Sequence, residues 1–117
     1  MAVNTNRDPN NLEAKRGDTL VKKFILKDKE GEPYPLSGYV IKSQGRLVPD
    51  AEETVYDVTI VDGGENDFDD GIVVLRVPYA VTANFPPMFS YDIEATSGTH
   101  RITVAFGQIT VKPDNTR

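Results

Sequence analysis

The sequence predicts an all-β protein, and three observations support this prediction. From Leu12 onward, apolar residues come in short runs separated by Gly, Pro, Asp and Asn, a spacing that is typical of strands and leaves no room for a long helix. The runs recur roughly every ten residues, as in antiparallel sandwiches. The chain has 117 residues, enough for one domain with one core. We therefore expect a single antiparallel β-sandwich of about seven strands over residues 12–117.

The first eleven residues, MAVNTNRDPNN, contain four Asn, one Pro and few apolar side chains. Such a segment cannot bury enough apolar surface to fold by itself. We expect a flexible N-terminal arm over residues 1–11 that becomes ordered only on a partner. Its candidate contact residues are Val3, Asn6 and Asn10.

The first strand is predicted at residues 19–26. Its apolar side chains fall on both faces: Leu20, Phe24 and Leu26 on one, Val21 and Ile25 on the other. A strand of this kind either lies centrally in a sheet or has its second face covered by a neighbouring molecule. Val21 and Ile25 are therefore candidate interface residues.

Three further strands are predicted in the middle of the chain, at residues 39–48, 54–61 and 71–77. Gly45 indicates a bulge in the first of them. The second alternates, and its apolar face supplies the core candidates Tyr56, Val58 and Ile60. A short helical turn is predicted over residues 79–85, where the proline pair that follows ends it.

The last two strands form a predicted hairpin, residues 89–96 and 100–111, around a tight turn at residues 97–99. The first has the clearest alternation in the chain, with Phe89, Tyr91, Ile93 and Ala95 pointing inward. In the second, the apolar side chains change face at Gly107: Ile102, Val104 and Phe106 precede it on one face, Ile109 and Val111 follow on the other. This change indicates a bulge at Gly107.

Composition excludes several classes of function. The chain has no cysteine and one histidine, His100, which excludes disulfides, thiolate metal sites and imidazole clusters. Its net charge of −5 argues against a hold on nucleic acid. No apolar run is long enough for a membrane span, and the N-terminus does not resemble a secretory signal. We expect no cofactor, no nucleic-acid partner and no membrane association.

One acidic loop has enough hard oxygens to hold calcium. It contains Asp62, Glu65, Asp67, Asp69 and Asp70. Their spacing differs from that of a helix–loop–helix calcium site, and runs of charge are usually solvated. These five residues are weak calcium candidates, and an ordinary solvated turn is favoured.

Two other short patterns have a functional and a structural interpretation. The tripeptide Arg16-Gly17-Asp18 occurs in integrin ligands, but a turn in which Gly17 supplies an unusual backbone angle explains it better. Asp92 and Glu94 lie two residues apart on one strand face, at a separation that suits a glycosidase. Such pairs are also routine on solvated strands. We favour the structural interpretation of both and predict no enzymatic activity.

A set of turn signals keeps a recognisable order along residues 16–117. It comprises Arg16-Gly17-Asp18-Thr19, Asp28 with Gly31 and Pro33, Leu36-Ser37-Gly38-Tyr39, Gly71, Thr82 before Pro86-Pro87, Tyr91-Asp92-Ile93-Glu94, and Gly107-Gln108-Ile109-Thr110-Val111. In this order the chain resembles the N-terminal immunoglobulin-like domain of siphophage baseplate upper proteins.

The resemblance implies an immunoglobulin-like sandwich and a non-enzymatic structural role in a bacteriophage virion. The expected role is that of a tail, baseplate or neck component or an adaptor, which docks onto other virion proteins or anchors a fibre. Such a part is expected to act as a homo-oligomer or a multi-copy assembly. Val21 and Ile25, or the segment Pro86, Pro87, Met88 and Phe89, would form the apolar docking patch. The alternatives are a carbohydrate- or cell-surface-binding β-sandwich module and a capsid decoration protein.

Overall fold

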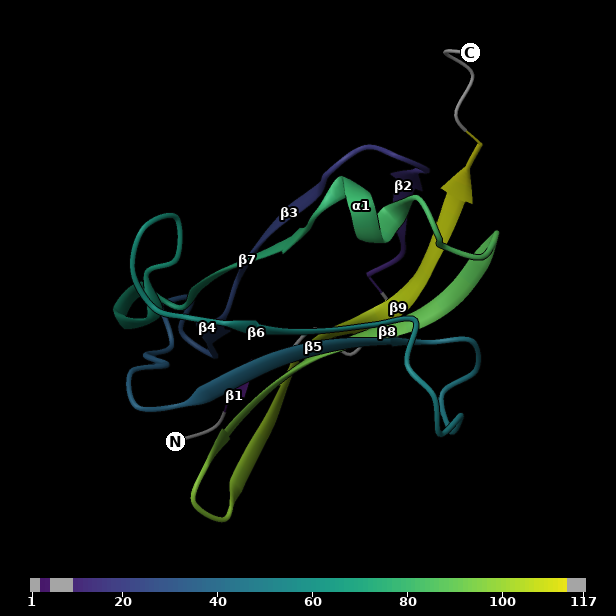
Figure 1. The fold of residues 1–117 in the computed structure, drawn as a ribbon. Coiled ribbons are helices and arrows are strands. Elements are labelled where there is room, and N and C mark those ends of the chain that lie inside the picture. Colours follow the sequence, from purple (N-terminus) through teal and green to yellow (C-terminus); the bar gives the residue numbers. More distant parts are fainter. Residues whose placement is uncertain (1–2, 5–9, 114–117) are drawn as a thin grey trace.

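The computed structural model describes residues 3–4 and 10–113, and its regular secondary structure is almost entirely β-strand (Figure 1). One mixed sheet has five strands in the order β2 (Leu12–Lys15), β9 (His100–Lys112), β8 (Met88–Ser97), β5 (Val40–Arg46) and β6 (Tyr56–Ile60). A second sheet pairs β3 (Leu20–Ile25) with β7 (Ile72–Val77), and β1 (Val3–Asn4) pairs with β4 (Lys27–Asp28). The helical turns are η1 (Phe68–Asp70) and α1 (Tyr79–Thr82). The all-β prediction is confirmed.

The prediction that all strands are antiparallel is wrong for β2. This strand runs parallel to β9, with Leu12 beside Ile109 and Lys15 beside Lys112. Tight turns force sequential strands to be antiparallel, but β2 and β9 are separated by almost the whole chain, so no turn constrains their direction. The pairing places Leu12 and Ala14 in the core, where both are buried.

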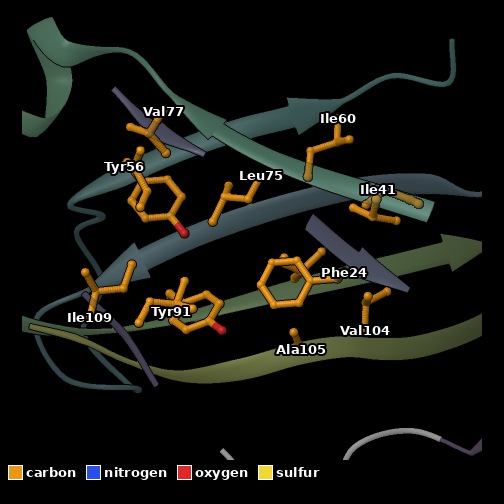
Figure 2. Close-up of a cluster of buried hydrophobic side chains, with 14 of the residues drawn as sticks. Phe24, Ile41, Tyr56, Ile60, Leu75, Val77, Tyr91, Val104, Ala105 and Ile109 are labelled. Atoms are coloured by element: carbon orange, nitrogen blue, oxygen red, sulfur yellow. The ribbon is translucent and has the colours of Figure 1, made fainter. Parts of the chain in front are cut away.

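The core lies between the two sheets (Figure 2). Phe24, Leu75 and Val77 come from the β3–β7 sheet and meet buried side chains of the five-stranded sheet, among them Ile41, Tyr56, Tyr91 and Ile109. The alternation predicted for residues 89–96 is confirmed, because Phe89, Tyr91, Ile93 and Ala95 are all buried. On β6, Tyr56 and Ile60 are buried, whereas Val58 is only partly so.

The bulge in the last strand lies earlier than predicted. Ile93 pairs with Ala105 and Glu94 with Thr103, so Val104 is the extra residue of β9. Both Val104 and Ala105 are buried, and alternation then turns Phe106 toward the outer face. The prediction that Phe106 shares a face with Ile102 and Val104 is therefore wrong.

Gly45 does not form the predicted bulge. It pairs in register with Tyr56 of β6 and Tyr91 of β8. A Cβ at this position would lie 2.6 Å from the Tyr56 ring and 2.7 Å from the Phe89 ring. The residue is glycine because two aromatic rings pack directly onto its backbone.

The last two residues assigned to the arm belong to the folded domain. The Asn10 N–H donates to the Phe106 carbonyl at 2.7 Å, and the Tyr91 hydroxyl donates to the Asn10 carbonyl at 2.6 Å. The Asn11 side chain accepts a bond from the Gln108 N–H at 3.1 Å. Of the other predicted contact residues, Val3 pairs with Asp28 in the β1–β4 ladder. Asn6 lies outside the described residues.

Candidate functional site

Val21 and Ile25, predicted as interface residues, are exposed on β3. Their side chains are 47% and 51% exposed and lie on the face of β3 that points away from the core. Within the described part of the chain, β3 is bonded to β7 only. Among the described residues β3 is therefore not a central strand, and its second apolar face is exposed.

The outer edge of β7 is capped by the loop that precedes it. The Ile72 N–H donates to the Asp67 carbonyl at 2.8 Å, and the Asp67 N–H donates back at 3.1 Å. The Val74 N–H donates to the Asn66 side chain at 2.6 Å. These bonds occupy backbone groups of Ile72 and Val74 that point away from β3. Because hydrogen-bonded and non-bonded pairs alternate in an antiparallel ladder, the β3 residues opposite them also turn their backbone groups away from β7.

Within the part of the chain that the structure describes, the outer edge of β3 has no such cap. Val21, Lys23 and Ile25 face Arg76, Val74 and Ile72. Their N–H and C=O groups therefore point outward, and no described residue bonds to them from another strand or loop. We refer to these backbone groups, with the exposed Val21 and Ile25 side chains beside them, as the β3 edge.

Several carboxylates of the acidic loop bond to other groups of the protein. Glu65 forms a two-pronged ion pair with Arg76 of β7, at 2.7 and 2.9 Å, and this partner lowers the pKa of the Glu65 carboxyl. Asp62 accepts a bond from the Phe68 N–H at 3.1 Å, and Asp69 accepts one from the Ser37 hydroxyl. The nearby Asp67 raises the pKa of Asp70.

These carboxylates do not come together as a metal site. Among residues 3–4 and 10–113, no three acidic or histidine side chains are placed to hold a metal ion. The geometry gives the loop a different role, which is to close over β7 and cap its edge.

The segment Pro86 to Phe89 is only in part a surface. Phe89 is 2% exposed, and its ring centroid lies 4.7 Å from that of Phe85 and 6.1 Å from that of Tyr56. The prediction that Phe89 docks a partner is wrong, because its strand position points it into the core. Pro87 and Met88 are exposed, and Pro86 is partly so.

The tripeptide Arg16-Gly17-Asp18 forms a turn fixed to α1. Gly17 has a φ of 90°, as the structural interpretation predicts. Its N–H donates to the Thr82 hydroxyl at 3.2 Å, and that hydroxyl donates to the Asp18 carbonyl at 2.8 Å. The Arg16 guanidinium donates to the Phe85 carbonyl at 3.2 Å. The Arg16 side chain is therefore held by a hydrogen bond within the fold.

A pocket of about 400 Å³ lies on the outer face of the five-stranded sheet, and the sequence did not predict it. We call it the outer-face pocket. Its lining comes from β5, β8 and β9, with the segment before β2 and the loop after β5 at its rim: Asn11, Gln44, Arg46, Pro49, Ser90, Tyr91, Asp92, Phe106, Gly107 and Gln108. Asn10 crosses Gly107 at close range, since a Cβ on Gly107 would lie 2.6 Å from the Asn10 carbonyl oxygen. Only glycine admits this crossing.

The charged groups of the pocket are one acid and one base. Arg46 donates to the carbonyls of Ala51 and Glu52 at 2.7 and 3.0 Å and to the Gln44 side chain at 2.8 Å. Burial raises the pKa of Asp92, the neighbouring Glu94 raises it further, and Arg46 opposes the shift. The Asp92 carboxylate accepts no hydrogen bond from the described part of the chain.

No protein-family model matches this chain, and no curated protein matches it either. Among the described residues, no helix is long and apolar enough to cross a membrane. Function is inferred from the two surfaces, the β3 edge and the outer-face pocket.

Proposed function

We propose that the protein is a non-enzymatic structural component of a bacteriophage virion that docks onto a neighbouring protein through the β3 edge. The order of turn signals along the sequence supports the virion assignment. The open β3 edge supports docking as the mode of action. The role we propose is that of a tail, baseplate or neck component or an adaptor.

The strand order supports an immunoglobulin-like assignment of the sandwich. In immunoglobulin domains of the variable type, strands G, F, C and C′ lie in one sheet, and strands B and E lie in the other. Here β9, β8, β5 and β6 follow one another in one sheet, while β3 and β7 form the other. Taken in chain order, these six strands correspond to B, C, C′, E, F and G.

The observation that carries the docking proposal is the difference between the two edges of the β3–β7 sheet. Proteins protect exposed strand edges, because an open edge can pair with any extended chain. The edge of β7 is protected at Ile72 and Val74 by three hydrogen bonds from residues 66–67. Within residues 3–4 and 10–113, no such bonds reach the β3 edge, and it has apolar side chains beside it. This is the arrangement expected where a partner adds a strand.

The side chains of β3 indicate the chemistry of that strand. Lys23 lies between Val21 and Ile25 on the same outer face, and all three are exposed. An added strand places alternate side chains over this face. The partner segment that fits best is extended and has an apolar, an acidic and an apolar side chain at three successive alternate positions, opposite Val21, Lys23 and Ile25.

Particle composition tests the proposed function. Particles purified from a phage that encodes this chain are expected to contain it in many copies, as measured by quantitative mass spectrometry. Infectious particles that lack the protein would overturn the virion assignment. The docking proposal is tested separately with β3 variants, because a chain can be a virion protein and dock through another surface.

A further inference from the structure

We propose that the outer-face pocket binds a neutral saccharide, with Phe106 as the surface on which a sugar ring stacks and Asp92 as the acceptor for its hydroxyls. The pocket lies on the outer face of the five-stranded sheet, whereas the β3 edge belongs to the other sheet. The inference therefore stands apart from docking.

The first argument is the position of Phe106. The β9 bulge turns this ring out of the core into a polar strand face, where it is partly exposed and lines the pocket. Its neighbours across the sheet are Asp92 and, beyond it, Gln44. A flat apolar ring surrounded by polar groups suits a ligand with one apolar face and a polar rim. A sugar ring has this character.

The second argument is the set of polar groups left without partners. The Asp92 carboxylate is partly buried and accepts no hydrogen bond from a described residue, although its two oxygens can accept several. The Ser90 hydroxyl and the Gln108 side-chain amide line the same pocket and make no hydrogen bond within the described chain. Ser90 and Gln108 are register neighbours on β8 and β9. Together they offer donors and acceptors that sugar hydroxyls can satisfy.

The third argument is that the adjoining wall is already fixed. Arg46 is held by the carbonyls of Ala51 and Glu52, and its other end holds the Gln44 side chain. The Gln44 amide in turn donates to Asp57 at 3.0 Å. Side chains held in this way lose little entropy when a ligand binds.

Charge and size define the class of ligand. The opposite charges of Asp92 and Arg46 offset each other, so the pocket has no net preference for an anion or a cation, and a neutral polyhydroxyl compound fits it. The volume, about 400 Å³, lies at the lower end of the range of small-molecule sites, roughly 300–1,000 Å³. A short saccharide is therefore the ligand class that the pocket fits.

Nuclear magnetic resonance titration of the ¹⁵N-labelled protein tests the proposal. The probes are maltose, cellobiose, lactose and N,N′-diacetylchitobiose, each raised to millimolar concentration. At least one of them is expected to cause saturable shifts of the amides of Ser90, Asp92, Phe106 and Gln108. Absence of saturable shifts with all four sugars, or shifts confined to amides outside the pocket, would overturn it.

Matched variants show whether the shifts come from this pocket. Asp92→Ala and Phe106→Ala are each expected to weaken binding about tenfold or more, since each removes a principal contact. Glu94→Ala truncates a carboxylate two residues away that does not line the pocket, and it is expected to bind as the unmodified protein does. Equal affinity of Asp92→Ala and Glu94→Ala, with both folded by their amide spectra, contradicts the assignment.

Discussion

At the scale of single residues, an aromatic cluster packs around Gly45, near the end of β5 where β6 and β8 begin. The rings of Tyr56, Phe85 and Phe89 lie with centroids 4.7 to 6.1 Å apart. The Tyr56 hydroxyl lies 2.7 Å from that of Ser43, which donates to the Asp92 carbonyl at 2.8 Å. Burial raises the pKa of Tyr56, and it raises the pKa of Tyr91 to about 12. The cluster thus joins β5, β6 and β8.

Truncation of Phe89 and of its exposed neighbour Met88 compares a core position with a surface position. Phe89→Ala is expected to lower the free energy of unfolding by about 3–5 kcal/mol, because it empties a ring-sized space in the cluster. Met88→Ala should lower it by less than about 1 kcal/mol, because half of that side chain is already in water. Urea denaturation of both variants measures the difference. Similar small losses in both would contradict the burial of Phe89.

Asp92 makes stability depend on pH. Its pKa is raised in the folded protein, so the folded state holds this proton more tightly than the unfolded state. The resulting stabilisation is present below the ordinary pKa of aspartate, 3.8, and is lost as the pH rises through the raised folded pKa.

The Asp92→Asn variant checks that sign. It should be more stable than the unmodified protein at pH 7, by less than about 1 kcal/mol because solvent screens this partly exposed group. The gain should vanish below the ordinary aspartate pKa. Thermal melts across this pH range measure it, with the exposed Glu53→Gln as the control. A variant that is less stable at pH 7 would contradict the assigned shift.

At the scale of elements, the two edges of the β3–β7 sheet differ: the β7 edge is capped at Ile72 and Val74, and no described residue bonds to the β3 edge. The acidic loop, whose charge made it a weak calcium candidate, supplies the cap on Ile72 and Val74 of β7 and pairs Glu65 with Arg76. On β3, the backbone groups of successive residues point in opposite directions. Lys22 faces Leu75 within the bonded ladder, and Lys23 directs its N–H outward.

Proline substitutions distinguish these two positions. Lys23→Pro removes only an outward N–H and should cost less than about 1 kcal/mol, because proline is accepted at a free strand edge. Lys22→Pro removes a ladder bond and should cost about 3 kcal/mol. Chemical denaturation measures both losses. If Lys23→Pro costs as much as Lys22→Pro, the N–H of Lys23 is bonded and the β3 edge is not open.

The elements differ in how far the sequence could predict them. Alternation placed β8 correctly, because every second residue from Phe89 to Ala95 is apolar. It could not locate the β9 bulge, because Val104, Ala105 and Phe106 are consecutive apolar residues and the face can change at any of them. Nor could it predict the parallel pairing of β2, which depends on a contact across the chain. The outer-face pocket could not be predicted either, because it depends on both features. The β9 bulge turns Phe106 outward, and the β2 pairing places Asn11 beside Gln108.

At the scale of the whole molecule, the two sheets expose surfaces of different composition. The β3–β7 sheet presents the β3 edge, where β3 turns toward solvent the side that does not pair with β7 and has exposed apolar side chains beside it. The five-stranded sheet presents a polar face with one outward aromatic ring in a pocket. A sandwich of this kind can be held by a neighbouring protein on one face and meet a ligand on the other.

The central claim, docking through the β3 edge, is tested most directly by particle incorporation of Ile25→Lys. Val40→Lys is the matched control, because Val40 is 58% exposed on the outer face of the other sheet. We predict that both variants keep the melting temperature of the unmodified protein, and that only Ile25→Lys is lost from purified particles. Incorporation of Ile25→Lys in full amount would contradict the claim. A large fall in its melting temperature would contradict it as well, because it would place Ile25 in the core.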